Sequence, residues 1–204
     1  MTLRLSTTPS LVKLSPRAAE SHERDLLAEL VSRLRARDDI LIDRVLRELF
    51  PEVRRWMFRQ LGPRPELEDA VQDALSEIAS ALHRFEGRSS VSTLAHRIVL
   101  RTSYRYYKKA KRPRPVQRVD IVADDDPEAR VRARAALRRL HTALEQLPER
   151  RRAAFVLCAI DGLDPREAAE VMGVSANAMR SLLCRARAQL EEILEDDDEL
   201  GRRR

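Results

Sequence analysis

The sequence predicts an all-α protein of two small helical domains joined by a flexible linker, the second domain carrying a helix-turn-helix. Apolar side chains recur at steps of three and four residues in the patterned segments, as on helices that face a core. Residues 113–132, which lie between these segments, are rich in Pro and Asp, and residues 163–190 carry the signals of two helices and a tight turn. A chain of 204 residues has room for two such domains.

The composition excludes several classes of protein. The two cysteines, Cys158 and Cys184, lack a CxxC pattern or a nearby His, so we expect no metal, no cofactor and no disulfide framework. No apolar run approaches the roughly 20 residues of a membrane span, and the N-terminus lacks the apolar region of a signal peptide. These features predict a cytoplasmic protein without membrane insertion. Because the net charge of +6 is a small excess among 35% charged residues, the positions of the basic residues matter more than their number.

The first 61 residues divide into an extension and two helical patterns. Residues 1–25 mix Ser, Thr, Pro and charges without a period, which predicts a flexible extension whose role the sequence does not reveal. One apolar pattern runs from Leu26 to Leu34 and a second from Leu41 to Leu61. Pro51 is expected to interrupt or restart the second helix, and Gly62 to end it.

Residues 66–85 predict a helix with one apolar and one acidic face. The apolar stripe consists of Leu67, Ala70, Val71, Ala74, Leu75, Ile78, Leu82 and Phe85. The outer face consists of Glu68, Asp69, Gln72, Asp73 and Glu77. Such a face is either simply solvated, which the residues alone favour, or it docks a basic or polar protein surface.

The next helix has the opposite character. It follows a polar loop at residues 86–90, and no acidic residue occurs between Arg88 and Val119. Basic side chains recur along one face: Arg97, Arg101, Arg105, Lys108 and Arg112. Because an unbalanced basic stripe repels itself, it predicts contact with nucleic acid. The interleaved Tyr104, Tyr106 and Tyr107 either stack on unpaired bases or belong in part to the core.

A second helical domain is predicted at residues 133–194, followed by a charged tail at residues 195–204. Residues 133–147 form its first helix, and Pro148 opens another that Gly162 closes. Asp164 is then a candidate N-cap, with Glu167 placed to complete a capping box. Gly173 can take the left-handed conformation that ends a helix, and Ser175 can cap the next one.

The last helix has a core face and a face suited to DNA. Its core side consists of Met179, Leu182, Leu183, Ala186 and Leu190. Its other side consists of Ser175, Ala176, Asn177, Arg180, Ser181, Cys184, Arg185 and Arg187. Small residues at the helix start allow close approach to a major groove, where Asn can bind adenine and Arg can bind guanine or phosphate. The simpler alternative is a solvated polar face.

Taken in order, residues 66–75, residues 84–98 and residues 147–190 resemble three motifs of one protein family. This family is the extracytoplasmic-function (group 4) branch of the sigma-70 factors of bacterial RNA polymerase. The likeness covers about residues 26–194, with residues 26–112 similar to region 2 and residues 133–194 similar to region 4. It departs from the family pattern at Leu94, where Trp is usual, at Arg101-Thr102, at Leu182 and at Arg37, where Gly is frequent.

The resemblance implies roles for these surfaces, with core RNA polymerase and promoter DNA as partners. The acidic helix would dock on polymerase through Glu68, Asp69, Gln72 and Asp73. The unpaired −10 strand would be held by Phe85, Gly87, Arg88, Ser89, Ser90, Arg97, Arg101, Arg105 and Lys108. The −35 duplex would be read by Ser175, Ala176, Asn177, Arg180, Ser181, Arg185 and Arg187. An anti-sigma factor is a further partner that the resemblance implies, and the acidic linker residues 124–126 would lie toward the RNA path.

Two other classes of function compete with this one. A stand-alone helix-turn-helix regulator would bind duplex DNA without polymerase and would have no use for the acidic stripe. A nucleic-acid enzyme is disfavoured, because the four histidines, at positions 22, 83, 96 and 141, are scattered, and no carboxylate–His or Cys–His constellation converges by spacing. The sequence therefore predicts a promoter-specificity factor without catalytic residues of its own, and His96 as a DNA-facing or partly buried residue.

Overall fold

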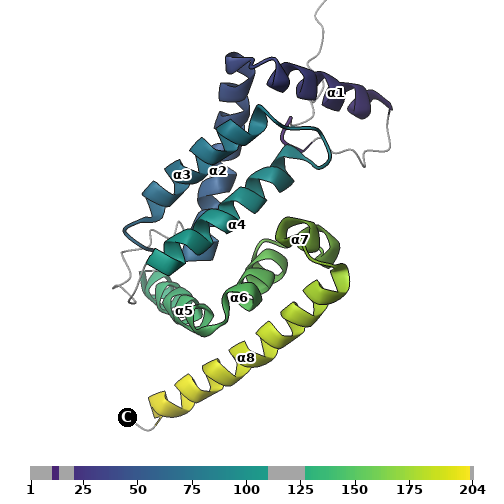
Figure 1. Cartoon of the computed structure of the whole chain (residues 1–204). Coiled ribbons are helices and arrows are strands. Elements are labelled where there is room, and N and C mark those ends of the chain that lie inside the picture. The colour runs from purple at the N-terminus through teal and green to yellow at the C-terminus, as the bar shows by residue number, and fades with distance from the viewer. Residues whose placement is uncertain (1–10, 14–20, 110–126, 203–204) are drawn as a thin grey trace, which may run out of the picture. The chain divides into compact units, whose positions relative to one another are not determined.

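The computed structural model of the protein describes residues 11–13, 21–109 and 127–202 (Figure 1). The described residues form helices and connecting turns without a strand, which confirms the predicted fold class. The helices are α1 (Ser21–Arg35), α2 (Asp39–Leu61), α3 (Leu67–Leu82), α4 (Val91–Lys109), α5 (Pro127–Gln146), α6 (Glu149–Phe155), the π-helix η1 (Val156–Ile160), α7 (Pro165–Met172) and α8 (Ala176–Arg202). The linker residues 113–126, including the acidic residues 124–126, lie outside the described residues, as do residues 1–10 and 14–20 of the extension.

The chain divides into two compact units, and the division runs through α2 and α4. The first unit spans Met1–Trp56 and Glu68–Thr102, and therefore holds α1, most of α2, α3 and most of α4. The second unit spans Met57–Leu67 and Ser103–Arg204, and holds the ends of α2 and α4 together with α5 to α8.

In the first unit each helix buries one stripe of side chains, as the apolar patterns predict. Leu34 of α1, Leu49 of α2, Ile78 of α3 and Val99 of α4 are all inaccessible to solvent. The ring of Trp56 in α2 stacks on the ring of His96 in α4, with centroids 4.2 Å apart and an interplanar angle of 8°. Because His96 is only 3% exposed, the structure places it in the core; of the two expectations for His96, burial holds and a position facing DNA does not.

Two helix boundaries of the first unit differ from the sequence expectation. Helix α1 starts at Ser21, inside the predicted extension of residues 1–25. Helix α2 runs without interruption through Pro51. Pro51 is exposed, so the carbonyl that loses its hydrogen bond to the missing N–H can be hydrated by water, and the packing of the buried face holds the helix together.

The turn between α1 and α2 requires a left-handed residue, and that residue is Arg37, with φ of 57°. The Arg37 N–H donates to the Leu34 carbonyl at 3.2 Å, and the Asp38 N–H donates to the Arg33 carbonyl at 3.2 Å. This pair of bonds is a Schellman ending, which usually has glycine at the left-handed position. The sequence pattern of the sigma-70 factors, which this chain resembles, likewise often has glycine at this position.

The second unit is organised around α8, which packs on α5, α6 and α7. Its core is a cluster of buried residues: Ala143, Leu144, Leu147, Val156, Ala186 and Leu190. The helix predicted from Pro148 to Gly162 is in fact α6 followed by η1, a turn of wider π-helix that ends at Ile160 and has Asp161 as its C-cap. Apolar periodicity does not distinguish these two windings over so few residues.

Two further boundaries lie outside their predicted positions. Helix α5 begins at Pro127, so residues 127–132 of the predicted linker are helical. Proline suits the first position of a helix, where its missing N–H has no intrahelical partner to lose. Helix α8 continues to Arg202, through most of the predicted tail of residues 195–204.

Candidate nucleic-acid and polymerase interfaces

The first helix of the predicted helix-turn-helix has the capping box that its sequence indicates. The Asp164 carboxylate accepts from the backbone N–H groups of Arg166 at 2.6 Å and Glu167 at 3.0 Å. The Glu167 carboxylate in turn accepts from the Asp164 N–H at 3.1 Å. The two side chains thus satisfy N–H groups that have no partner within α7, and they fix where α7 begins.

The turn that follows is equally well specified by local residues. Gly173 has φ of 65°, in the left-handed region, and ends α7. The Val174 N–H donates to the Ala169 carbonyl at 3.0 Å, which completes a Schellman ending. The Ser175 hydroxyl accepts from the Ala178 N–H at 3.2 Å, so it caps α8 as predicted.

Helix α8 separates its two faces as its sequence predicts. Met179, Leu183, Ala186 and Leu190 are buried, and Leu182 is half-buried at the edge of the core. The predicted reading face is open, with Ala176 half-buried and the rest exposed: Ser175, Asn177, Arg180, Ser181, Arg185 and Arg187. The Arg180 guanidinium donates to the Asn177 side-chain oxygen, so the two predicted base-reading groups are hydrogen-bonded to each other.

The acidic face of α3 is exposed at all four residues predicted to contact polymerase, namely Glu68, Asp69, Gln72 and Asp73. Two ion pairs to neighbouring helices border this face. Arg54 of α2 donates to Glu68 at 2.9 Å, and Arg101 of α4 donates to Glu77 at 2.6 Å. The paired carboxylates, Glu68 and Glu77, belong to the predicted outer face. Asp69 and Gln72 lie between them along α3.

The loop at residues 85–90 connects α3 to α4 and is well anchored. Phe85 is buried at 5% exposure, so its ring belongs to the core of the first unit. Arg88 is exposed and pairs with Glu86 at 2.8 Å. The Ser90 hydroxyl accepts from the Thr93 N–H at 3.0 Å, which caps α4, and the half-buried Ser89 lies beside it in the loop.

Gly87 shows that the loop packs against α1, a contact that the sequence does not predict. Its φ is 71°, and a side chain there would bring a Cβ atom within 2.9 Å of a methyl carbon of Val31. A glycine is therefore required both by the backbone conformation and by the close approach. The glycine itself is a sequence signal, but its partner on α1 is far away in the chain.

The four basic residues of α4 predicted to bind the strand are exposed: Arg97, Arg101, Arg105 and Lys108. Of these, Arg101 is engaged by Glu77 in the ion pair described above. The side chain of Arg101 is 68% exposed, so solvent screens this pair, and a phosphate can compete for the guanidinium.

The tyrosines of α4 are placed mainly against protein. Two guanidinium groups of the second unit lie over the Tyr107 ring, Arg152 at 3.4 Å and Arg64 at 4.5 Å from its centroid. The Tyr107 hydroxyl donates to the Gln60 carbonyl at 2.8 Å. Tyr104 is half-buried, and this burial raises its pKa to about 12. Of the two roles left open by the sequence, packing therefore describes Tyr104 and Tyr107 in this structure.

Within the described residues, no group of three or more His, Cys, Asp or Glu side chains is arranged to hold a metal ion. Cys158 is half-buried and Cys184 is exposed on α8, and both are free thiols. Over the same residues, no helix is long and apolar enough to cross a membrane.

Two models of known protein families match the chain, in the order that the resemblance predicts. The family described as "Sigma-70 region 2" matches residues 45–113, and that described as "Sigma-70, region 4" matches residues 137–190. The chain is also 32% identical over 148 residues to the RNA polymerase sigma factor CnrH of Cupriavidus metallidurans, covering 67% of this chain and 78% of that protein. The chain belongs to the sigma-70 family.

Other relatives place this sigma factor in the extracytoplasmic-function branch. It is 29% identical over 173 residues to the extracytoplasmic-function sigma factor SigM of Mycobacterium tuberculosis, covering 85% of this chain and 86% of that protein. The structure of CnrH in complex with the cytosolic domain of CnrY has a similar fold, with a TM-score of 0.62, 24% identity and coverage of 82% of this chain and 96% of that chain. The structure of the sigma factor RpoE bound to the anti-sigma factor NepR from Bartonella quintana gives a TM-score of 0.55 at 21% identity, covering 75% of this chain and 96% of that chain.

Proposed function

We propose that this sigma factor docks on core RNA polymerase through α3, reads the −35 duplex through α8, and holds the melted −10 strand with the loop at residues 85–90 and α4. The match to region 2 as well as region 4 carries this proposal, because a stand-alone helix-turn-helix regulator has no need of region 2. The protein then acts by binding alone. Groups that hold unpaired bases better than paired ones shift the promoter toward its open state.

The exposed face of α8 supports the −35 role. Ala176 at its start is small, and Asn177 and Arg180 follow where side chains can reach base edges in a major groove. Arg185 and Arg187 lie further along the helix and can neutralise phosphates. The capped start of α8 fixes the position of these groups relative to the core of the second unit.

The exposed carboxylates of α3 support the polymerase role. Asp69 and Asp73 project from a helix whose opposite face packs in the core of the first unit, so the acidic face is presented on an anchored helix. A basic surface on polymerase would meet it with complementary charge, which favours fast association and correct docking.

A charge-reversal experiment tests the polymerase role. Asp69→Arg with Asp73→Arg should reduce co-elution with core polymerase at least tenfold and abolish transcription in vitro, because like charges then face each other at the interface. The matched control is Glu192→Arg, an exposed helical position of α8. Unchanged core binding by the double variant, with wild-type circular dichroism, would remove α3 from the interface.

We further propose that an anti-sigma factor binds this protein. We also propose that this sigma factor acts in the cytoplasm, where core RNA polymerase transcribes DNA. The support is that the similar structures of CnrH and RpoE were solved in complexes, the latter with a protein named as an anti-sigma factor. A purified candidate partner should lower the fraction of this sigma factor that co-elutes with core polymerase. A candidate that forms a complex yet leaves core binding intact is not such a factor.

A further inference from the structure

A short N-terminal segment, residues 11–13, is built into the first unit. Val12 is 5% exposed, although it comes from a polar stretch without any apolar period, whereas the neighbouring Lys13 is exposed. A side chain buried to this degree contributes apolar packing, so this N-terminal segment is part of the core of the first unit.

The same segment caps helix α4. The Ser92 N–H donates to the Val12 carbonyl at 2.9 Å. Ser92 lies in the first turn of α4, where N–H groups have no partner within the helix. The Ser90 hydroxyl satisfies the next N–H, that of Thr93. The start of α4 is therefore held by one cap from the loop itself and by one from the N-terminal segment.

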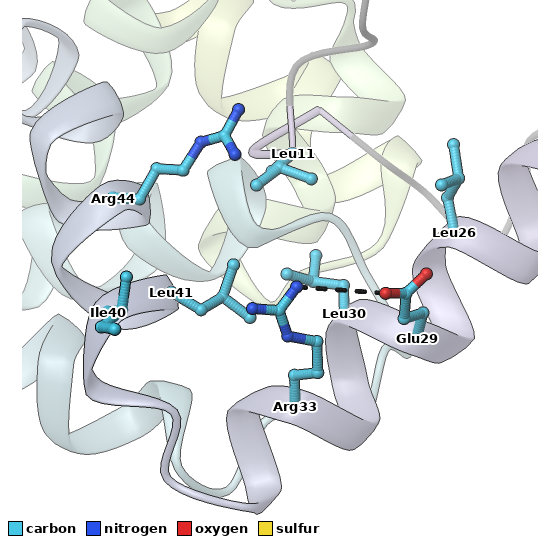
Figure 2. A pocket seen from close by; sticks show the side chains of 8 residues that line it. All are labelled: Leu11, Leu26, Glu29, Leu30, Arg33, Ile40, Leu41 and Arg44. Carbon is cyan, nitrogen blue, oxygen red and sulfur yellow. Dashed lines mark ion pairs between the residues drawn. The ribbon is translucent and has the colours of Figure 1, made fainter.

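The other end of the segment rests on α1 and α2. Leu11 lines a groove of about 180 Å³ between these helices, shown in Figure 2. The remaining residues that line it are Leu26, Glu29, Leu30, Arg33, Ile40, Leu41 and Arg44. The N-terminal segment thus links the groove to the first turn of α4.

The loop at residues 85–90 is held between these supports. On one side Gly87 packs against Val31 and Leu27 of α1. On the other side the loop ends at Ser90, directly before α4 and two residues before Ser92, whose N–H donates to the Val12 carbonyl. Movement at the start of α4 would therefore carry Ser89 and Ser90 with it.

We propose that the N-terminal segment is a brace that positions the strand-binding loop, a role that rests on the proposed capture of the −10 strand. A loop fixed in its binding shape loses less conformational entropy when the strand arrives, and its affinity is higher for that reason. The contacts described for this segment lie at the groove between α1 and α2 and at the first turn of α4, whereas polymerase docking is proposed for α3 and −35 reading for α8. Loss of the segment should consequently affect strand capture and leave polymerase docking and −35 reading intact.

The test uses holoenzyme assembled from core polymerase and the full chain. The probe is a fluorescent single-stranded oligonucleotide spanning the non-template −10 element of a promoter mapped by transcription in vitro. Val12→Asp places a carboxylate where a buried apolar side chain lies and should expel the segment. It should raise the Kd for the strand about five- to tenfold, while the Kd for a −35 duplex and for core polymerase stays within about twofold.

Three controls separate positioning from general damage. Lys13→Asp changes more charge at an exposed neighbouring residue and should leave strand binding unchanged. Val12→Ile keeps an apolar side chain and should bind as the wild type does. Hydrogen exchange at the Ser92 amide should accelerate in Val12→Asp and not in Lys13→Asp. If Val12→Asp folds poorly, a chain lacking residues 1–13 replaces it and should show the same weaker strand binding.

The outcomes are distinct. If Val12→Asp binds the strand as tightly as the wild type does, the proposed positioning role of the N-terminal segment is wrong, whereas the proposed capture of the −10 strand is unaffected. Tighter strand binding also overturns it, because the segment would then cover the site. A wild-type holoenzyme that binds the −35 duplex but not the strand overturns the capture role, and the brace with it.

Discussion

Arg37 occupies a backbone conformation that favours glycine. An L-residue in the left-handed region costs roughly 1–2 kcal/mol, and the Schellman turn between α1 and α2 imposes that conformation here. The side chain of Arg37 is exposed, so no buried contact repays the cost.

Arg37→Gly should therefore raise the free energy of unfolding by about 1 kcal/mol, the relief of strain being partly offset by the greater freedom of glycine in the unfolded chain. Urea denaturation followed by circular dichroism measures this difference. Arg37→Ala keeps the Cβ atom and should remain within about 0.5 kcal/mol of the wild type. Equal gains from both variants would show that the left-handed strain is not the cause.

Asn177 and Arg180 are coupled before DNA arrives, because the guanidinium donates to the amide oxygen. Each single substitution to Ala should cost about 1–3 kcal/mol of preference at one −35 position. The double variant should cost less than the sum, since either change already removes the shared hydrogen bond. Competition binding with −35 duplexes carrying each base measures this, with Glu191→Ala as an exposed control on the same helix. If the losses of the two single variants add up fully in the double variant, the hydrogen bond between Asn177 and Arg180 contributes nothing to −35 preference.

At the scale of elements, helix ends that depend on local side chains were predictable. The Asp164 capping box, the Gly173 turn and the Ser175 cap all lie within a few residues of the helix ends they fix. The apolar stripes of α3 and α8 were predictable for the same reason, since helical periodicity is a property of neighbouring residues.

Asp164→Ala tests how much this local code contributes. Loss of an N-cap typically costs about 1 kcal/mol of stability, and α7 supports the start of the reading helix. We expect a drop of that size in the free energy of unfolding and weaker binding to a −35 duplex. Asp164→Asn keeps a capping oxygen and should lose less than half as much. Equal losses from Ala and Asn would place the effect in the charge of Asp164 and not in its cap.

Features that depend on distant partners were missed. The ring of His96 stacks on Trp56 from another helix, and the Val12 carbonyl accepts a hydrogen bond from Ser92, which is distant in the sequence. Pro51 remains helical because tertiary packing holds both halves of α2. A single sequence records none of these pairings, which is why the exposed faces of α3 and α8 were predictable but the contacts that support the loop between α3 and α4 were not.

At the scale of the whole molecule, acidic and basic side chains concentrate on different helices, α3 and α4, which the Arg101–Glu77 ion pair joins. The chain carries +6 overall, yet the acidic face of α3 lies in the same unit as the basic residues Arg97 and Arg101 of α4. One unit therefore offers surfaces of opposite sign to a protein and to a nucleic acid. This separation is what a factor that joins polymerase to promoter DNA requires.

The most direct test is transcription by core polymerase with and without the protein on a genomic fragment library, followed by mapping of RNA start sites. We expect new, discrete starts that appear only with the protein and share two upstream elements, one near −35 and one near −10. Tight binding of the protein alone to duplex DNA, without polymerase association or new transcripts, would contradict a role in promoter-directed initiation.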